Sequence, residues 1–525
     1  MKYTEIKRFA ISVVLILCII LQGGCTTGNE NDLVDGTDTE VSTSGTETSD
    51  EPAPTEEPVV KADPIVIEAE DQDLSGNLVT ATSRKGYSGS GYVEGFKEET
   101  DELTFAVTIE DGGFYDLQFT TAADGSKTNF VLVDGVNVGD LKSGSKYFAN
   151  STLTHIYLTE GEHEISVATS WGWINLDKLT LIQSDPLPKN LYSVKAHLSN
   201  PNATDSTKRL MSYLLDIYGS QMLTGQYCDT GMIGTECAAI YNETGEYPAV
   251  LGLDFTSYSP ASVAHGSVGK STDQAIAYAN KGGIVTFCWH WTMPDEYATG
   301  NWYSTFYTDS CSFKLSKALD GSDPEGYQAL LDGIDAIAQQ LLILQEHDVP
   351  ILFRPLHEAS GGWFWWGASG ADAYKELYIL MYDKLTNEYG CNNLIWIWNG
   401  QSASWYPGDE YVDIIGIDIY PGEQVYSSQI DKFLECADIP NTRKIVVLSE
   451  NGCLFDPDLA ARDGAFWGFY ATWSGDFVLK SSKFAKYSEQ YTDVEMLKKV
   501  YSSDYMITRS ELPDLKNYPI RDDFD

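Results

Sequence analysis

The period of the hydrophobic and polar positions changes near residue 185. Between residues 64 and 185, apolar and polar side chains alternate in short runs, of which 103–109 is the clearest. A period of two is typical of half-buried strands. Turn sequences such as Asp111-Gly112-Gly113 and Asp134-Gly135 separate the runs. Short strands at this spacing predict an all-β sandwich, of the jelly-roll kind, for residues 64–185.

From residue 190 to 525, apolar strands alternate with helices. Eight runs read as buried strands: Met222–Tyr227, Ala249–Phe255, Gly283–Trp289, Pro350–Leu356, Leu394–Asn399, Asp413–Tyr420, Lys444–Glu450 and Ala465–Trp473. Helical runs separate many of them, for example Ala329–Gln345 and Ala371–Tyr389. Eight such strands with helical crossovers, in roughly 335 residues, predict a (β/α)8 TIM barrel and hence an α/β fold for this part.

The first 25 residues predict a targeting segment. Three basic residues precede an apolar run at 9–21, which is too short to span a bilayer comfortably and suits a signal peptide. The run ends in Leu21-Gln22-Gly23-Gly24-Cys25, which resembles a bacterial lipoprotein cleavage site with Cys25 as the lipidated residue. Gln22 departs from that pattern, since Leu is usual there. Ordinary secretion with cleavage nearby and an uncleaved anchor are the alternatives.

Residues 26–63 have a different composition. They are rich in Thr, Ser, Glu, Asp and Pro and carry few large apolar side chains. Such a segment cannot bury enough surface to offset its ordering entropy, and its acidic residues extend it. We expect a disordered acidic linker between a membrane anchor and the folded part.

Charge narrows the list of partners. The chain has 34 Lys and Arg against 77 Asp and Glu, a formal charge of −43. Because phosphate binding needs a basic face, nucleic acid is excluded as a partner, and a membrane is expected only through a lipid anchor. The 13 Trp and 32 Tyr are a heavy aromatic load, for which burial in a core is one explanation. Sugar-binding surfaces use such rings.

Chemistry in a (β/α)8 barrel is carried out at the carboxyl ends of its strands. The polar residues at these ends are Gln226, Asp254, His290, His357, Glu358, Asn399, Asp418, Tyr420 and Glu450. Glu358 and Glu450 would face each other across the mouth, and two flanking carboxyl groups are what glycoside hydrolysis needs. Asp418 is read as a structural hydrogen-bond partner, and Gln226, Asp254 and Asn399 receive no role.

The sequence motifs around these residues make the prediction of a glycoside hydrolase more specific. Phe353-Arg354-Pro355-Leu356-His357-Glu358 and Leu448-Ser449-Glu450-Asn451-Gly452 resemble glycoside hydrolase family 26, as do Cys288-Trp289-His290, Asp418-Ile419-Tyr420-Pro421 and Thr508-Arg509-Ser510-Glu511-Leu512-Pro513. The resemblance covers nearly all of 190–525. It implies a retaining endo-β-1,4-mannanase that needs no cofactor for catalysis.

The resemblance also implies roles for single residues. Glu358 is implied as the general acid/base and Glu450 as the nucleophile. Substrate contacts are implied for His290, His357, Trp363, Tyr420 and Trp473. The alternative for the two histidines is a satisfied buried side chain, and Trp365 and Trp366 are either core or rim. A retaining pair is expected about 5–5.5 Å apart.

Residues 64–185 resemble a family 35 carbohydrate-binding module. The matching motifs are Ile67-Glu68-Ala69-Glu70, Gly86-Tyr87-Ser88-Gly89-Ser90-Gly91-Tyr92-Val93 and Trp171-Gly172-Trp173-Ile174-Asn175-Leu176-Asp177. The resemblance implies a structural calcium ion held by Glu68, Glu70 and Asp177, and sugar contacts by Tyr87, Trp171 and Asn175. Alternatively, the two glutamates are solvated edge carboxylates, and one of Trp171 and Trp173 belongs to the core.

The sequence therefore predicts an extracellular, cell-surface lipoprotein that hydrolyses a β-mannan-type polysaccharide. A β-1,3-1,4-glucanase or β-1,3-xylanase of the same family is the first alternative, and a non-catalytic glycan-binding lipoprotein is the second. Seven cysteines lie in the barrel segment. Cys228 and Cys237 are close enough in sequence to close a short loop, but pairing cannot be read from sequence.

Overall fold

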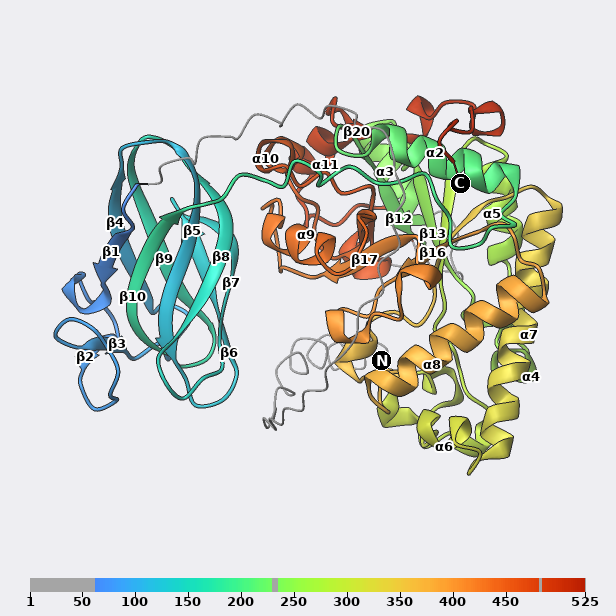
Figure 1. Cartoon of the computed structure of the whole chain (residues 1–525), viewed down its shortest axis with the longest axis horizontal. Coiled ribbons are helices and arrows are strands. Elements are labelled where there is room, and N and C mark those ends of the chain that lie inside the picture. Colours follow the sequence, from blue (N-terminus) through green and yellow to red (C-terminus); the bar gives the residue numbers. More distant parts are fainter. Residues whose placement is uncertain (1–61, 229–234, 481–483, 525) are drawn as a thin grey trace, which may run out of the picture.

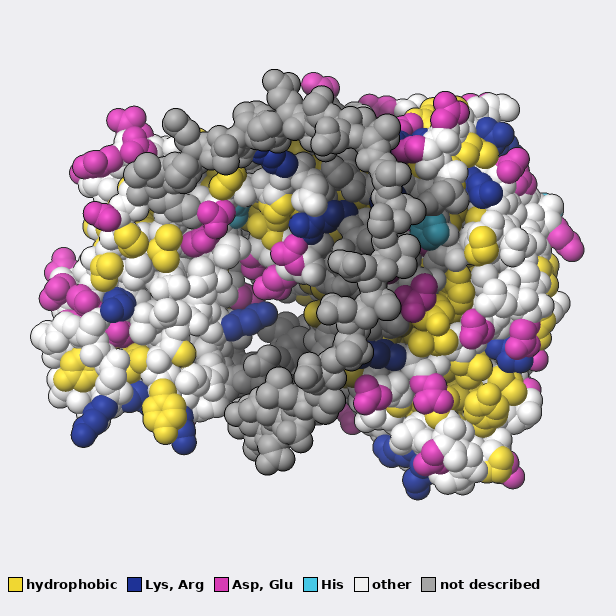
Figure 2. All heavy atoms as spheres, viewed as in Figure 1, with side chains coloured by type: hydrophobic (Ala, Val, Ile, Leu, Met, Phe, Trp, Pro, Cys, Tyr) yellow, Lys and Arg dark blue, Asp and Glu magenta, His cyan; other side chains and the backbone are white. Residues whose placement is uncertain are grey.

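The structure, a computed structural model, describes residues 62–228, 235–480 and 484–524. Figure 1 shows two parts, a β-rich module formed by the first described residues and a barrel formed by the rest. Within the described residues, no helix combines the length and the apolar character needed to cross a lipid bilayer. Acidic side chains are spread over the visible face of both parts (Figure 2). The lipidation site predicted at Cys25 and nearly all of the predicted linker lie outside the described residues.

The module is a sandwich of two antiparallel sheets, as the alternating pattern predicts. Its strands are β1 (Ile65–Glu68), β2 (Val79–Ala81), β3 (Tyr92–Glu94), β4 (Glu102–Ile109), β5 (Gly113–Ala122), β6 (Lys127–Val133), β7 (Val136–Ser143), β8 (Ala149–Leu158), β9 (Gly161–Trp171) and β10 (Asn175–Gln183). One sheet has the order β2-β3-β10-β5-β8 with β1 also on β10, and the other has the order β4-β9-β6-β7. In β4, Leu103, Phe105 and Ile109 point into the core between the sheets.

The barrel closes through eight parallel strands in sequence order. They are β12 (Gly225–Tyr227), β13 (Val250–Asp254), β14 (Ile284–Cys288), β15 (Ile351–Arg354), β16 (Leu394–Trp398), β17 (Ile414–Ile419), β18 (Ile445–Asn451) and β19 (Tyr470–Thr472). All eight predicted strands are present, so the predicted (β/α)8 fold is confirmed. Their interiors are almost wholly buried, which agrees with their continuous apolar runs.

The first predicted strand differs from the structure in one respect. It divides at Thr224 into β11 (Met222–Leu223) and β12, and β11 pairs with β20 (Met506–Ile507) near the end of the chain. Thr224 donates both its backbone N–H and its hydroxyl to the Ile507 carbonyl, at 3.0 and 2.9 Å. These two bonds turn the backbone from one partner strand to the other.

Helices cover the outside of the barrel. They are α2 (Asp205–Ile217), α3 (Thr235–Thr244), α4 (Pro260–Ala264), α5 (Ser271–Ala279), α6 (Leu315–Leu319), α7 (Pro324–Glu346), α8 (Ala371–Tyr382), α9 (Ile430–Ala437), α10 (Pro457–Asp463) and α11 (Val494–Tyr501). The long helix α7 begins where Asp323 accepts a hydrogen bond from the Gly326 N–H at 2.9 Å, with Pro324 at its first position. The predicted helix over 371–389 continues past Tyr382 as a wider turn, Asp383–Glu388.

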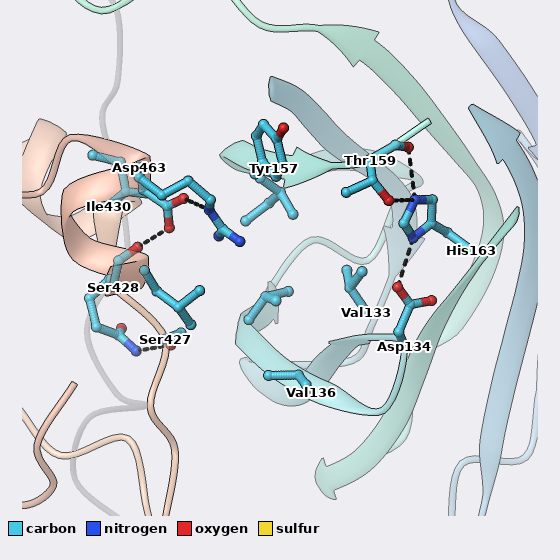
Figure 3. A pocket seen from close by; sticks show the side chains of 15 residues that line it. Val133, Asp134, Val136, Tyr157, Thr159, His163, Ser427, Ser428, Ile430 and Asp463 are labelled. Atoms are coloured by element: carbon cyan, nitrogen blue, oxygen red, sulfur yellow. Dashed lines mark hydrogen bonds and ion pairs between the residues drawn. The ribbon is translucent and has the colours of Figure 1, made fainter. Parts of the chain in front are cut away.

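The module contacts the barrel through β8, which lies against α9 and α10. A cavity of about 280 Å³ lies in this contact. In Figure 3, Val133 and Val136 of the module line it together with Ile430 of the barrel. Arg462 of α10 places its guanidinium 4.9 Å from the ring centre of Tyr157 in β8. The two parts therefore meet through packed side chains.

Candidate active site

Glu358 and Glu450 meet in the mouth of the barrel. Glu358 comes four residues after β15, and Glu450 lies near the end of β18. One carboxylate oxygen from each of Glu358, Asp418 and Glu450 lies within 4.8 Å of the others. Since inverting enzymes hold their carboxyl groups about 6.5–9.5 Å apart, this close approach favours a retaining arrangement.

The backbone around Glu358 is held in an unusual conformation. Leu356 and Glu358 have φ angles of 53° and 54°, a region that side-chain-bearing residues rarely adopt. The Glu358 N–H donates to the backbone oxygen of Asn399 at 2.8 Å and to its side-chain oxygen at 3.1 Å. Such conformations cost about 1–3 kcal/mol each and persist only where surrounding contacts impose them. Asn399, which the sequence left without a role, thus fixes the position of Glu358.

Both carboxylate oxygens of Glu450 accept hydrogen bonds. The fully buried Arg354 donates to Oε2 at 2.5 Å, and the Tyr420 hydroxyl donates to Oε1. Arg354 also donates to Asp418 at 2.7 Å. Asp418 accepts further bonds from Asn399 and Ser449, each at 2.8 Å, so it acts as the structural partner expected from the sequence. This network stabilises negative charge at Glu450 and fixes the direction of its oxygens.

Glu358 has a contrasting environment. Burial raises its pKa well above the usual range, and the negative charges of Asp418 and Glu450 raise it further. The indole N–H of Trp363 donates to its Oε2 at 3.0 Å. Glu358 therefore holds its proton to a higher pH than an ordinary glutamate does, while Glu450 accepts bonds from a guanidinium and a phenol. Two carboxyl groups in contrasting environments can divide the roles of acid and nucleophile.

The two predicted histidines lie side by side, with ring centres 4.7 Å apart. The ring Nδ1 of His290 is hydrogen bonded to Asp254 Oδ2 at 2.6 Å, and the backbone N–H of His290 donates to Asp254 Oδ1 at 3.1 Å. Asp254, left unplaced by the sequence, therefore orients His290. Burial lowers the pKa of His357 well below its usual value, and Arg354 and His290 lower it further, so His357 is neutral. Asp254 ends β13, and His290 lies just after the neighbouring strand β14. Comparing the residues at the ends of neighbouring strands would have predicted this contact.

Aromatic side chains line the site. Trp473 lies 5.7 Å from His290 and 5.0 Å from Tyr227, measured between ring centres. Tyr307 stacks on Phe364 at 5.4 Å, and burial together with the charges of Glu358 and Glu450 raises its pKa to about 12. The sequence analysis did not find Tyr307 because it lies in the long segment between β14 and α6, away from any strand end.

Trp365 and Trp366, left open between core and rim, are core residues. Both are almost fully buried, at 1 and 0 % exposure. The Trp366 indole donates to the His357 carbonyl at 2.8 Å, and the Trp365 indole donates to the Trp291 carbonyl at 2.8 Å. They therefore support the segment that carries His357 and Glu358.

In the module, Glu68, Glu70 and Asp177 gather around the loop at Ser88. The Ser88 hydroxyl contacts Glu68 at 2.8 Å and Asp177 at 3.2 Å, and Glu70 accepts bonds from the N–H groups of Ser90 and Gly91. Glu70 Oε2 is buried without a hydrogen-bond partner. Burial raises the pKa of Asp177, and the charge of Glu70 contributes.

These features fit a hard cation, which prefers several oxygen ligands. In the described residues, however, the ligand atoms of Glu68, Glu70 and Asp177 do not all lie within 4.8 Å of one another. Binding would require these side chains to move closer together.

A second cavity of the module, of about 420 Å³, includes Asn175 in its lining. Trp173, 64 % exposed, lines it too, together with Arg84, Glu94 and Lys127. Asn175 donates to Glu94 at 3.3 Å. Tyr87 packs against Tyr92 and is not among the lining residues, and the side chain of Trp171 lies outside the described part of the structure. The structure thus adds Trp173 as an exposed ring beside Asn175.

A buried glutamate with a raised pKa and a second glutamate held by hydrogen bonds, close together in the mouth of a (β/α)8 barrel, define a glycoside hydrolase. A family model agrees: "Glycosyl hydrolase family 26" matches residues 199–511. The chain belongs to glycosyl hydrolase family 26. The model "Carbohydrate binding module (family 35)" matches residues 65–183. Both resemblances noted in the sequence are confirmed.

Similar proteins align with both parts of the chain. A mannan endo-1,4-beta-mannosidase of Thermothelomyces thermophilus is 39 % identical over 88 % of this chain and 92 % of its own. Mannan endo-1,4-beta-mannosidase B of Piromyces sp is 32 % identical over 86 % of this chain and 77 % of its own. The crystal structure of a GH26-CBM35 beta-(1,4)-mannanase from Podospora anserina is 34 % identical, covers 86 % of this chain and 99 % of its own, and gives a TM-score of 0.61.

Proposed function

We propose that this protein is an endo-acting β-1,4-mannan hydrolase that retains the anomeric configuration. The observation that carries the proposal is the close approach of Glu358 and Glu450 in contrasting environments. Relatives named as mannan endo-1,4-beta-mannosidases, alignable over most of the chain, support mannan as the substrate. A retaining mechanism also agrees with membership of family 26.

Each step follows from the chain's own residues. Glu358 protonates the leaving glycosidic oxygen while Glu450 attacks the anomeric carbon, and a covalent glycosyl-enzyme forms. Arg354 and Tyr420 aim the attacking carboxylate. Once Glu450 is esterified, it no longer carries the negative charge that helps to raise the pKa of Glu358, so this pKa falls. The ionised Glu358 can then activate water for the second displacement. His290, His357, Trp363 and Trp473 shape the sugar subsite.

Two alternatives were open from the sequence. A β-1,3-1,4-glucanase or β-1,3-xylanase activity is less favoured, because the Thermothelomyces and Piromyces relatives that align over most of the chain are named for mannan. A non-catalytic glycan-binding lipoprotein is disfavoured because both carboxylates are present and hydrogen bonded.

Hydrolysis of a panel of glycans tests the substrate. We expect the protein to release oligosaccharides of several lengths from mannan, galactomannan and glucomannan, with little product from lichenan or β-1,3-xylan. Proton NMR during the first minutes should show the β-anomer forming first. Preferential release from lichenan or β-1,3-xylan would reject the mannan assignment, and the α-anomer as first product would reject retention.

For the remaining parts of the chain, we propose a signal peptide at 1–25 lipidated at Cys25, a linker at 26–63, a carbohydrate-binding module at 64–185 and the hydrolase at 190–525. The enzyme is then extracellular and tethered to the cell surface. The module's exposed Trp173, next to Asn175, gives a flat apolar ring on which a sugar can stack. A mannan-type polysaccharide is its proposed ligand.

We further propose that Glu68, Glu70 and Asp177 hold a structural calcium ion. Calcium titration by calorimetry should give a binding signal with the full chain and none with Glu70→Gln, because the buried Glu70 Oε2 would lose its charge. Asp71→Asn, at an exposed neighbouring carboxylate, is the control and should bind normally. Chelation should lower the melting temperature without changing the rate on a short mannooligosaccharide. Equal binding by wild type and Glu70→Gln would reject this site.

A further inference from the structure

The sulfur atoms of Cys228 and Cys237 lie 3.2 Å apart, and both residues are buried. Seven cysteines belong to the described residues, all with free thiols, and among them these two are the one pair whose sulfur atoms are in contact. The sulfurs of Cys288, Cys391 and Cys453 instead contact backbone oxygens. We propose that Cys228 and Cys237 form an intramolecular disulfide.

Both cysteines are anchored by regular structure. Cys228 directly follows β12, and its N–H donates to the Gly252 carbonyl at 3.0 Å. Cys237 is the third residue of α3. A disulfide has an S–S length of about 2.0 Å, so the sulfurs need to approach by only about 1 Å. We expect side-chain rotation to supply this movement, since only the sulfur positions need to change.

The bond would join two elements that flank the sugar subsite. Tyr227, next to Cys228, lies 5.0 Å from Trp473 and accepts a hydrogen bond from Arg354 at 3.2 Å. Glu236, next to Cys237, accepts a hydrogen bond at 3.3 Å from the N–H of Gly475, two residues beyond Trp473. Linking β12 to α3 therefore restrains both Tyr227, which contacts Trp473, and Glu236, which binds the backbone near Trp473. This inference stands independently of the substrate.

Disulfide formation is a two-electron oxidation. One thiolate attacks a small disulfide such as oxidised glutathione and releases one glutathione thiolate, which takes up a proton. The second cysteine thiolate then displaces the other glutathione. The two protein thiols become one disulfide, and one oxidised glutathione becomes two thiols.

Alkylation of the full chain tests this proposal. The purified protein is incubated with oxidised glutathione or with dithiothreitol, and free thiols are trapped under denaturing conditions. We expect two fewer alkylated thiols after oxidation, and peptide mapping should show the peptides of Cys228 and Cys237 joined. Equal thiol counts, a stable glutathione adduct at either residue, or a different pair would overturn the proposal.

Thermal unfolding gives a second reading. The oxidised wild type should melt about 5 °C above the reduced wild type, because the cross-link restricts the unfolded chain. The variant C228S/C237S should lose this difference, whereas Cys391→Ser should keep it. The comparison of oxidised and reduced wild type stands even if the double variant folds poorly. A melting temperature independent of redox state would contradict a stabilising cross-link.

Discussion

Replacing Glu450 by Ala is expected to reduce mannan hydrolysis on the order of 10⁴-fold or more, because it removes the proposed nucleophile. This corresponds to roughly 5–6 kcal/mol of lost transition-state stabilisation. The structure makes Glu450 the best-positioned carboxylate for this role, since Arg354 and Tyr420 each hold one of its oxygens. The measurement is kcat/KM on galactomannan.

A control must separate lost chemistry from lost folding. Glu450→Ala leaves Arg354 with Asp418 as its remaining carboxylate partner, so circular dichroism and melting temperature are measured alongside the rate. Glu450→Gln keeps the volume of the side chain and should be equally inactive. Glu495→Ala, at an exposed glutamate of α11, should keep full activity. A well-folded Glu450→Gln variant with wild-type turnover would refute the assignment.

Replacing Glu358 by Ala is expected to have an effect that depends on the leaving group. On mannan the rate should fall about 10²- to 10⁴-fold, because the poor leaving oxygen is no longer protonated. An aryl mannooligoside with an activated leaving group departs without that proton, so formation of its glycosyl-enzyme should be much less affected. Azide should then accelerate turnover and give a product of retained configuration, since it reacts with the glycosyl-enzyme in place of water.

The pH profile distinguishes Glu358 from a residue that only supports the fold. The acid works only while protonated, and burial together with Asp418 and Glu450 raises its pKa well above the usual range. Activity of the wild type should therefore persist to near-neutral pH and decline as the pH rises through this raised value. For Glu358→Ala on the activated substrate, this alkaline decline should disappear. An unchanged decline would assign it to another group.

The barrel could be predicted from the sequence because its strands are buried on both faces. Runs such as Leu394–Trp398 and 445–448 are apolar throughout, and each is followed by a candidate side chain. Glu358 and Glu450 were found in this way. The hydrogen bonds that the Glu358 N–H donates to the two oxygens of Asn399 were not, because they depend on a left-handed backbone conformation that no sequence pattern predicts.

Other parts depended on tertiary contacts. Tyr307 reaches the site from a long connection, and only packing against Phe364 places it there. In the module, β2 and β3 are three residues each, too short to show an alternating pattern. The exposure of Trp173 was also hidden, because period alone does not say which tryptophan of a Trp-Gly-Trp sequence faces water.

The contact of β8 with α9 and α10 has a consequence for how such enzymes can be rearranged. Helix α9 follows β17, which ends one residue before Tyr420, and α10 follows β18, which carries Glu450. A chain shortened to the barrel would expose the apolar surface around Ile430 and Leu459, and would tend to self-associate. A transplanted module would have to match that surface in shape as well as in ligand, so shuffling of these parts during evolution requires coordinated change on both sides.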